Sequence, residues 1–222
     1  MTKQIVVFAF LLIVLFSYKV SAQTSQENYF DNQGRPFTKK TSEIEGDPYL
    51  FDKWLPGKVQ AANDKTYDGF KLKYDIADDL LVFAYDSADE PLKFVDDIKT
   101  FTIILPEPIV FTNGFPSIDK QTSQSYYQLI SNGKTKLLKR RTKVVLESKG
   151  YNTVVKKYQE YNNYYIFKDN KIAKLENPKK TLYALAGAKK TDIDNYLKSN
   201  SINFKRDEDL ARLFDYYNTL AQ

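Results

Sequence analysis

Residues 126–146 read YYQLISNGKTKLLKRRTKVVL, and this stretch decides the fold class. Two runs rich in aromatic and aliphatic residues flank Asn132-Gly133, which is a strong short-range signal for a β-hairpin. A second hairpin follows, because Asp169-Asn170 separates strand-like runs at residues 158–168 and 171–175. Consecutive hairpins of this kind predict an antiparallel sheet built largely from neighbours in sequence.

The region before the first hairpin predicts further strands. Short strands are expected at residues 58–62, 70–75, 80–85, 101–105 and 109–111. Phe70, Leu72 and Tyr74 alternate with lysines, which indicates a half-buried strand in a meander with one wet face. The continuous apolar run at 101–105 favours a central strand. Pro106-Glu107-Pro108 then predicts an edge or corner, because proline cannot donate to a strand ladder.

The pattern becomes helical after Pro178. Leu182, Leu185 and Ala186 have helical spacing before a stop at Gly187. Thr191 is predicted to cap the next helix, whose apolar stripe is Ile193, Tyr196 and Leu197. The last helix has one apolar face and three acids at its start: Leu210, Leu213, Phe214, Tyr217 and Leu220, with Asp207, Glu208 and Asp209. The predicted class is therefore α+β, an antiparallel β-rich body of meander and hairpins followed by two or three short C-terminal helices.

The N-terminus predicts where the protein works. Residues 1–22 contain a positive start, an apolar run and small residues at the end, which is typical of a secretory signal peptide cleaved between Ala22 and Gln23. An uncleaved anchor is the alternative, although a membrane-spanning helix needs about 20 apolar residues and this run is shorter. The mature protein is expected to be exported, to the periplasm, the cell surface or beyond, and not to be integral to a membrane.

The sequence also predicts the domain organisation. Residues 23–45 predict a polar arm or linker, with a small hairpin between Tyr29-Phe30 and Phe37. Residues 46–222 predict a single β-rich domain whose helical part occupies about 179–222. We expect Trp54 to anchor the core where this domain begins.

Composition excludes several classes of chemistry. The 222 residues contain no cysteine and no histidine. Disulfides and Ser-His-Asp or Cys-His catalysis are therefore excluded, and the usual zinc sites built around histidine are disfavoured. The formal net charge of +5 falls by two when Lys3 and Lys19 leave with the signal peptide, and such a mild charge implies no nucleic-acid partner. No catalytic residue, cofactor or metal is predicted.

Three groups of residues are candidates for functional sites. The loop around Asp64 to Gly69 partly matches a calcium-binding pattern, but a hairpin turn explains the same residues. Asp78-Asp79 and Asp96-Asp97 suggest carboxylate catalysis, although neighbours on a strand point apart and each pair supplies at most one group. A ligand surface for a glycan, lipid or protein of the cell envelope is predicted at Tyr158, Tyr161, Tyr164, Tyr165, Arg140 and Arg141, with cross-strand pairing and solvated charge as the alternative.

A resemblance rests on short motifs along the mature chain. These motifs are Gly46-Asp47-Pro48-Tyr49-Leu50, Trp54-x-x-Gly57-x-Val59, Tyr67, and Leu72-x-Tyr74-Asp75. They resemble the opening of small exported proteins common in Bacteroidota, and the ending from Thr191 to Asn218 is similar to theirs. That group has no assigned activity, so the resemblance implies an exported protein and no functional residues.

Taken with composition, these features favour a non-catalytic binding or structural accessory module. Two alternatives stay open. One is a carboxylate-dependent polysaccharide hydrolase, and the other is a lipid-handling protein with an apolar cavity between sheet and helices.

Overall fold

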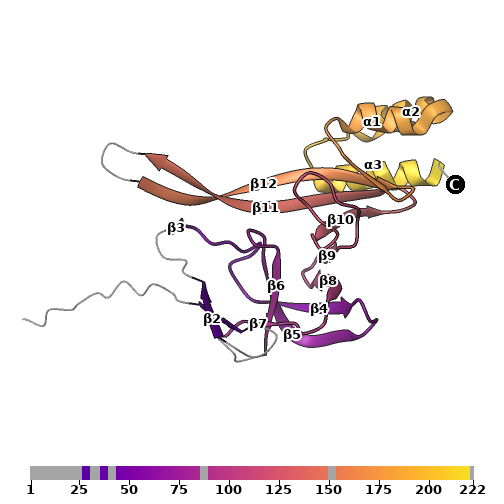
Figure 1. Ribbon diagram of the computed structural model, residues 1–222. Helices are drawn as coiled ribbons and strands as arrows, with labels where there is room; N and C mark the ends of the chain where they lie inside the picture. Colours follow the sequence, from indigo (N-terminus) through magenta and orange to yellow (C-terminus); the bar gives the residue numbers. More distant parts are fainter. Residues whose placement is uncertain (1–26, 31–35, 40–43, 86–89, 150–153, 221–222) are drawn as a thin grey trace, which may run out of the picture.

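A single, largely antiparallel sheet carries most strands of this chain (Figure 1). The computed structural model describes residues 27–30, 36–39, 44–85, 90–149 and 154–220. The predicted signal peptide and its cleavage site between Ala22 and Gln23 lie outside the described residues. Within those residues the strands precede three C-terminal α-helices, which confirms a β-rich α+β fold.

The strands of the large sheet follow the order β13-β12-β11-β10-β9-β8-β4-β5-β6-β7. Their bounds are β4 Leu55–Ala61, β5 Thr66–Asp75, β6 Leu80–Ala84, β7 Leu92–Lys93, β8 Ile98–Ile103, β9 Ile109–Thr112, β10 Tyr127–Asn132, β11 Lys136–Lys149, β12 Val154–Lys168 and β13 Lys171–Lys174. A further short strand, β3 (Ile44–Glu45), pairs in parallel with β12. The chain returns from β7 to place β8 beside β4, so the sheet consists of two meanders joined along that pair.

Both predicted hairpins are present. β10 and β11 pair antiparallel with Asn132 opposite Lys136, so a short loop containing Gly133 joins them. β12 and β13 are joined at Asp169-Asn170, whose φ angles of 49° and 57° match a two-residue hairpin turn. The expected central position of the 101–105 run is also confirmed, because β8 lies between β4 and β9.

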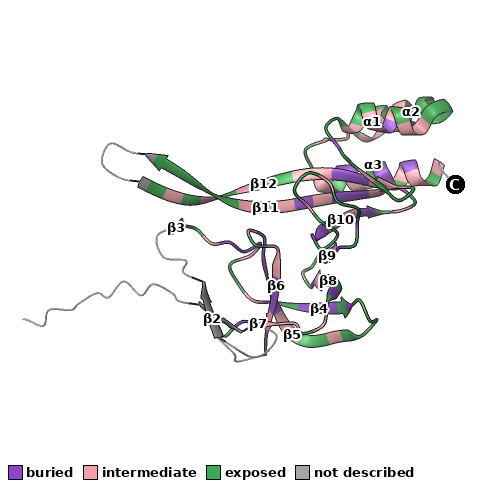
Figure 2. Ribbon diagram, in the orientation of Figure 1, coloured by how far each residue is buried: buried purple, intermediate pink, exposed green. Residues whose placement is uncertain are grey.

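Buried side chains form two large clusters and one small one. The first cluster lies on β4, β5, β6, β8 and β9, where Tyr74 packs edge-on against Phe101 and Phe111 at 5.1 Å between ring centroids. The second lies where the helices meet β11 and β12 (Figure 2). The small third cluster includes Tyr127 and Tyr165. The sheet therefore has two halves, each with its own core.

Three helices end the chain: α1 (Pro178–Ala186), α2 (Lys190–Asn200) and α3 (Asp207–Leu220). Asn177 caps α1 by accepting a hydrogen bond from the Lys180 backbone, and Gly187 ends it as predicted. The predicted cap at Thr191 is wrong. A 3-10 turn at Gly187–Lys189 runs directly into α2, so Thr191 already lies inside the helix and its side chain caps nothing.

The last helix follows its predicted pattern. Leu210, Leu213, Phe214 and Tyr217 are all buried, and α3 packs against β10 and β11. Its first turn carries the three acids that the positive end of a helix dipole favours.

In the N-terminal part, the predicted small hairpin is present, but Trp54 does not anchor the core. β1 (Glu27–Phe30) pairs with β2 (Pro36–Lys39), and Tyr29 lies opposite Phe37, which confirms the small hairpin. Trp54 is only half-buried, with the Lys73 ammonium 5.8 Å from its ring centre, so it is not the core anchor that was expected. The first cluster forms instead around aromatic residues of β5, β8 and β9.

Candidate functional site

The six residues predicted as a ligand surface lie on two faces of the sheet. The register of β11 against β12 places Arg140 opposite Asn163 and Arg141 opposite Asn162. Side chains alternate along a strand, so Arg140 and Arg141 point to opposite faces. One face carries Arg140, Tyr161 and Tyr165, and the other carries Arg141, Tyr158 and Tyr164.

Two of these residues are not at the surface, which corrects the prediction for both. Arg140 is 6% exposed and Tyr165 is 1% exposed. Tyr165 packs edge-on against Tyr127 and donates a hydrogen bond to Asp119 at 3.0 Å. The physical reason is that this face of β12 covers the third core cluster, so the alternation that suggested an open aromatic surface reflects packing instead.

Arg140 joins the two halves of the sheet. Its Nη1 atom donates hydrogen bonds to the Tyr126 carbonyl at 2.7 Å, the Asp79 carboxylate at 2.9 Å and the Tyr74 hydroxyl at 3.1 Å. Tyr74 in turn donates to Asp79 at 2.5 Å. Tyr74 and Asp79 belong to the first meander and Arg140 to the second, so the ion pair crosses the junction between them. We call these residues the Arg140 node.

The two phenols of the Arg140 node, Tyr74 and Tyr126, are not suited to proton exchange near neutral pH. Burial raises the pKa of Tyr74 well above its ordinary value, and the nearby Asp79 charge raises it further. Burial also raises the pKa of Tyr126, again with a contribution from Asp79. Both phenols therefore stay protonated, and the arrangement neutralises a buried guanidinium.

Tyr164 and Arg141, two half-buried members of the predicted surface, are engaged in internal contacts, whereas Tyr161 is exposed. Tyr164 donates to Asp207 at 2.5 Å, and the same carboxylate forms an ion pair with Lys139 at 2.7 Å. Burial and the Asp207 hydrogen bond both raise the pKa of Tyr164. Arg141 donates twice to Glu160, at 2.8 and 3.0 Å. These contacts attach α3 and hold β11 to β12.

Three of the four acids in the two candidate pairs line a common pocket of about 300 Å³. Asp79, Asp96 and Asp97 all border it. Asp96 accepts hydrogen bonds from Tyr67, Lys65 and Asn63, and the bond from Tyr67 is the main cause that lowers its pKa. Glycoside hydrolysis needs an acid whose pKa is raised, and Asp96 has the opposite environment.

The loop that suggested calcium forms the turn between β4 and β5. Asp64 adopts a left-handed conformation with φ of 64°, and its backbone N–H donates to the Ala61 carbonyl at 3.1 Å. Among the described residues no group of three acidic side chains is placed to hold a metal ion.

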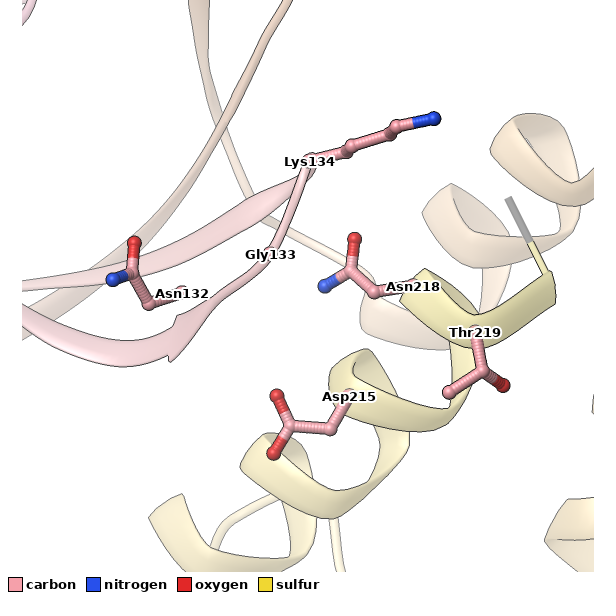
Figure 3. Close-up of a pocket in the computed structure, with 6 residues that line it drawn as sticks. All are labelled: Asn132, Gly133, Lys134, Asp215, Asn218 and Thr219. Atoms are coloured by element: carbon pink, nitrogen blue, oxygen red, sulfur yellow. The ribbon is translucent and has the colours of Figure 1, made fainter. Parts of the chain in front are cut away.

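A polar pocket of about 530 Å³ lies between the β10–β11 turn and the end of α3 (Figure 3). Asn218 points from α3 toward Gly133 in this view. Its amide accepts from the Thr135 N–H and donates to the Thr135 carbonyl, both at 2.9 Å. On the same helix, Asp215 accepts a hydrogen bond from Ser131 at 2.5 Å. These α3 side chains form hydrogen bonds with residues of the β10–β11 hairpin, so the main role of the polar groups in this pocket is to attach α3 to that hairpin.

The most suitable binding site is an open groove of about 760 Å³ beside the start of α3. We call it the α3 groove. Its apolar walls are Leu105, Pro106, Pro108, Ile109, Leu129, Ile130 and Ala211. Its polar lining is Glu107, Gln128, Arg141, Arg206, Asp207 and Glu208. Mostly apolar walls with a few polar groups are typical of ligand sites.

The polar groups of the α3 groove differ in whether they have partners. Arg141 and Asp207 already form the ion pairs described above, and Arg206 lies 3.4 Å from Glu208. The Oε1 atom of Gln128 is buried and accepts no hydrogen bond. A buried acceptor without a donor is costly, so this atom favours a ligand that donates a hydrogen bond.

Sequence reasoning did not find the α3 groove. It identified Pro106-Glu107-Pro108 as a corner and Asp207 to Asp209 as a helix start, but it had no reason to bring them together. Gln128 carried no signal of its own, because a polar residue on a hairpin strand ordinarily faces solvent.

Comparisons with known proteins found no match to this chain, whether a protein family, a curated protein or a solved structure. Among the helices in the described parts of the chain, none has the length and hydrophobicity needed to cross a bilayer.

Proposed function

We propose that this chain is an exported, non-catalytic binding protein of the periplasm or cell surface. Its α3 groove receives an extended peptide segment of a cell-envelope partner. The observation that carries this proposal is Gln128, which lines an apolar groove and whose buried Oε1 atom has no donor. Export is supported by the pattern of residues 1–22.

A peptide matches the groove better than the alternative ligands. An extended peptide presents backbone N–H groups that can pair with Gln128, and apolar side chains that can lie against Leu129 and Ile130. The charged side chains of the groove other than Glu107 already form ion pairs within the chain, which favours a ligand with little net charge. An acyl chain offers no donor, and a lipid carrier would need an enclosed apolar cavity, whereas this groove is open to solvent.

Site-specific photo-crosslinking in the native cell envelope tests the proposal. A photoreactive amino acid at Pro108, on the groove wall, should give protein adducts. The same amino acid at Pro116, another exposed loop proline outside the groove, should give none. Equal adducts at both positions, or no adduct at Pro108, would refute a peptide site in the groove.

A substitution then tests the atom that carries the argument. Gln128→Leu removes the acceptor while filling similar space, so the fold should tolerate it. Adduct yield at Pro108 should fall about tenfold, which is the effect of one lost hydrogen bond of about 1.4 kcal/mol. Unchanged yield would show that Gln128 does not contact the ligand.

Export is tested separately by the intact mass of the exported protein, which should show Gln23 at its N-terminus.

A further inference from the structure

The sequence contains Asn-Gly twice, at residues 113–114 and 132–133. Asparagine is a thermally labile residue, and a following glycine has no side chain to obstruct attack of its nitrogen on the asparagine amide. Both pairs lie where a strand ends, because β9 ends at Thr112 and β10 ends at Asn132. Their hydrogen bonds nevertheless differ, and this difference separates a reactive pair from a protected one.

The first pair is held by hydrogen bonds on both of its residues. Asn113 is 9% exposed, and its Nδ2 atom donates to the Ile98 carbonyl at 2.9 Å. The Gly114 N–H donates to the Ser123 carbonyl at 2.7 Å. Ring closure would break both bonds, because the Gly114 nitrogen is the attacking atom and the Asn113 amide nitrogen is the leaving group. The fold therefore protects this pair.

The second pair is open to attack. Figure 3 shows Asn132 and Gly133 at the edge of the pocket beside α3. Asn132 is exposed, and within the described residues no acceptor pairs with its amide nitrogen or with the Gly133 N–H. Its Oδ1 atom accepts a hydrogen bond from the Lys136 ammonium. Only the oxygen of an amide can accept from an ammonium, so this contact fixes the orientation of the amide.

The contact with Lys136 also activates the amide. Attack on the Asn132 Cγ atom places negative charge on Oδ1, and a cation that donates to this oxygen stabilises that charge. Lys136 is half-buried and lies opposite Asn132 in the register of β10 and β11. The pairing of the two strands therefore holds the ammonium beside the amide.

We propose that Asn132-Gly133 is a site of spontaneous deamidation, whereas Asn113-Gly114 is not. The Gly133 nitrogen attacks the Asn132 Cγ atom and loses its proton to solvent, and the Cγ–Nδ2 bond breaks with release of ammonia. Water then opens the cyclic imide. Cleavage of its nitrogen–Cγ bond gives aspartate, and cleavage of the bond from nitrogen to the main-chain carbonyl carbon gives isoaspartate. The net reaction consumes water and releases ammonia.

Isoaspartate at position 132 would weaken the attachment of α3. It carries the main chain through the side-chain carbon and so adds a methylene group to the turn. In the same turn, the Asn218 amide pairs with both backbone groups of Thr135 at 2.9 Å. A longer turn displaces these groups, so the urea midpoint of the isoaspartate form should fall below that of the fresh chain. Asn132→Asp changes the charge without lengthening the main chain, and it should keep the original midpoint.

Timed incubation of the mature chain in mildly alkaline buffer, followed by peptide mapping with mass spectrometry, tests the inference. Conversion at Asn132 should be at least about tenfold faster than at Asn113, since one lost hydrogen bond corresponds to about that factor. Lys136→Met should slow conversion at Asn132 at least about threefold, and Lys136→Arg, which keeps a charged donor, should retain the rate. Lys134→Met is the matched control, because it removes the same charge from the same turn and leaves the Lys136 contact in place. It should leave the rate unchanged.

Three results would overturn the inference. Equal conversion at Asn113 and Asn132 would show that the fold does not select between the two pairs. Equal slowing by Lys136→Met and Lys134→Met would exclude activation by the Lys136 contact. No conversion at Asn132, while a free peptide of residues 130–136 converts, would show that the folded turn protects this pair as well. Matching urea midpoints for the lysine variants are the check that folding is intact.

Discussion

Removing the Arg140 guanidinium tests the junction between the two halves of the sheet. Arg140→Met keeps most of the side-chain volume and deletes three hydrogen bonds, of which the one to Asp79 is an ion pair at 2.9 Å. The side chains of Arg140 and Asp79 are 7% and 21% exposed, so the pair is largely shielded from water. Breaking one partner of a buried pair costs about 3–5 kcal/mol. Because Asp79 keeps some contact with solvent, we expect a loss of about 3 kcal/mol.

Urea denaturation of the mature chain measures this loss. Arg141→Met is the matched control, because the neighbouring Arg141 forms its ion pair with Glu160 on a more exposed surface, where such pairs contribute about 0–1 kcal/mol. In a double-mutant cycle, Arg140→Met and Asp79→Asn together should lose about 2 kcal/mol less than the sum of the single losses.

Two outcomes would refute the reasoning about this junction. One is a loss below about 1 kcal/mol for Arg140→Met, which is the size expected of a surface pair. The other is additivity of the two substitutions within about 0.5 kcal/mol, since residues that do not interact behave in that way.

The remaining predictions concern helix attachment, backbone packing and tyrosine ionisation. Asn218→Ala should cost about 2 kcal/mol in urea, since it leaves two buried backbone groups unpaired, whereas exposed Asn195→Ala should cost under about 0.5 kcal/mol. Gly57→Ala should cost about 1–3 kcal/mol by the same assay, because the added methyl group would lie 2.2 Å from a Leu72 methyl carbon; an unchanged midpoint would contradict that packing. Burial raises the pKa of Tyr127 to about 12, so its contribution to stability is complete below the ordinary value of 10.0 and is lost as pH rises through about 12. Ultraviolet titration of the original chain against Tyr127→Phe should show one phenol fewer ionising in that range.

Local patterns in the sequence predicted the elements well where the responsible forces are local. Asn132-Gly133 and Asp169-Asn170 specify turns by their own backbone preferences, and both hairpins are present. The apolar spacing from Leu210 to Leu220 specifies a helix with one buried face. The wrong prediction of a helix cap at Thr191 also has a local cause. The 3-10 turn at Gly187–Lys189 leads directly into α2, so that helix has already begun before Thr191.

Prediction of surfaces failed where a distant segment covers a residue. Arg140 and Arg141 look alike in sequence, and only the pairing of β11 with its neighbours makes one of them buried. The partner of Arg140 is Asp79, which belongs to one of the two acid pairs that suggest carboxylate catalysis. No local property of either residue indicates that they meet.

The chain by itself determined its hairpins, its final helix and the absence of histidine and cysteine chemistry, because each of these depends on residue identity or on neighbours a few positions away. Only the tertiary structure decided that an arginine joins the two meanders and that the buried Oε1 atom of Gln128 lacks a donor. Those properties depend on which segments pack against each other in the sheet. The free energy of that packing comes from many residues that are far apart in sequence.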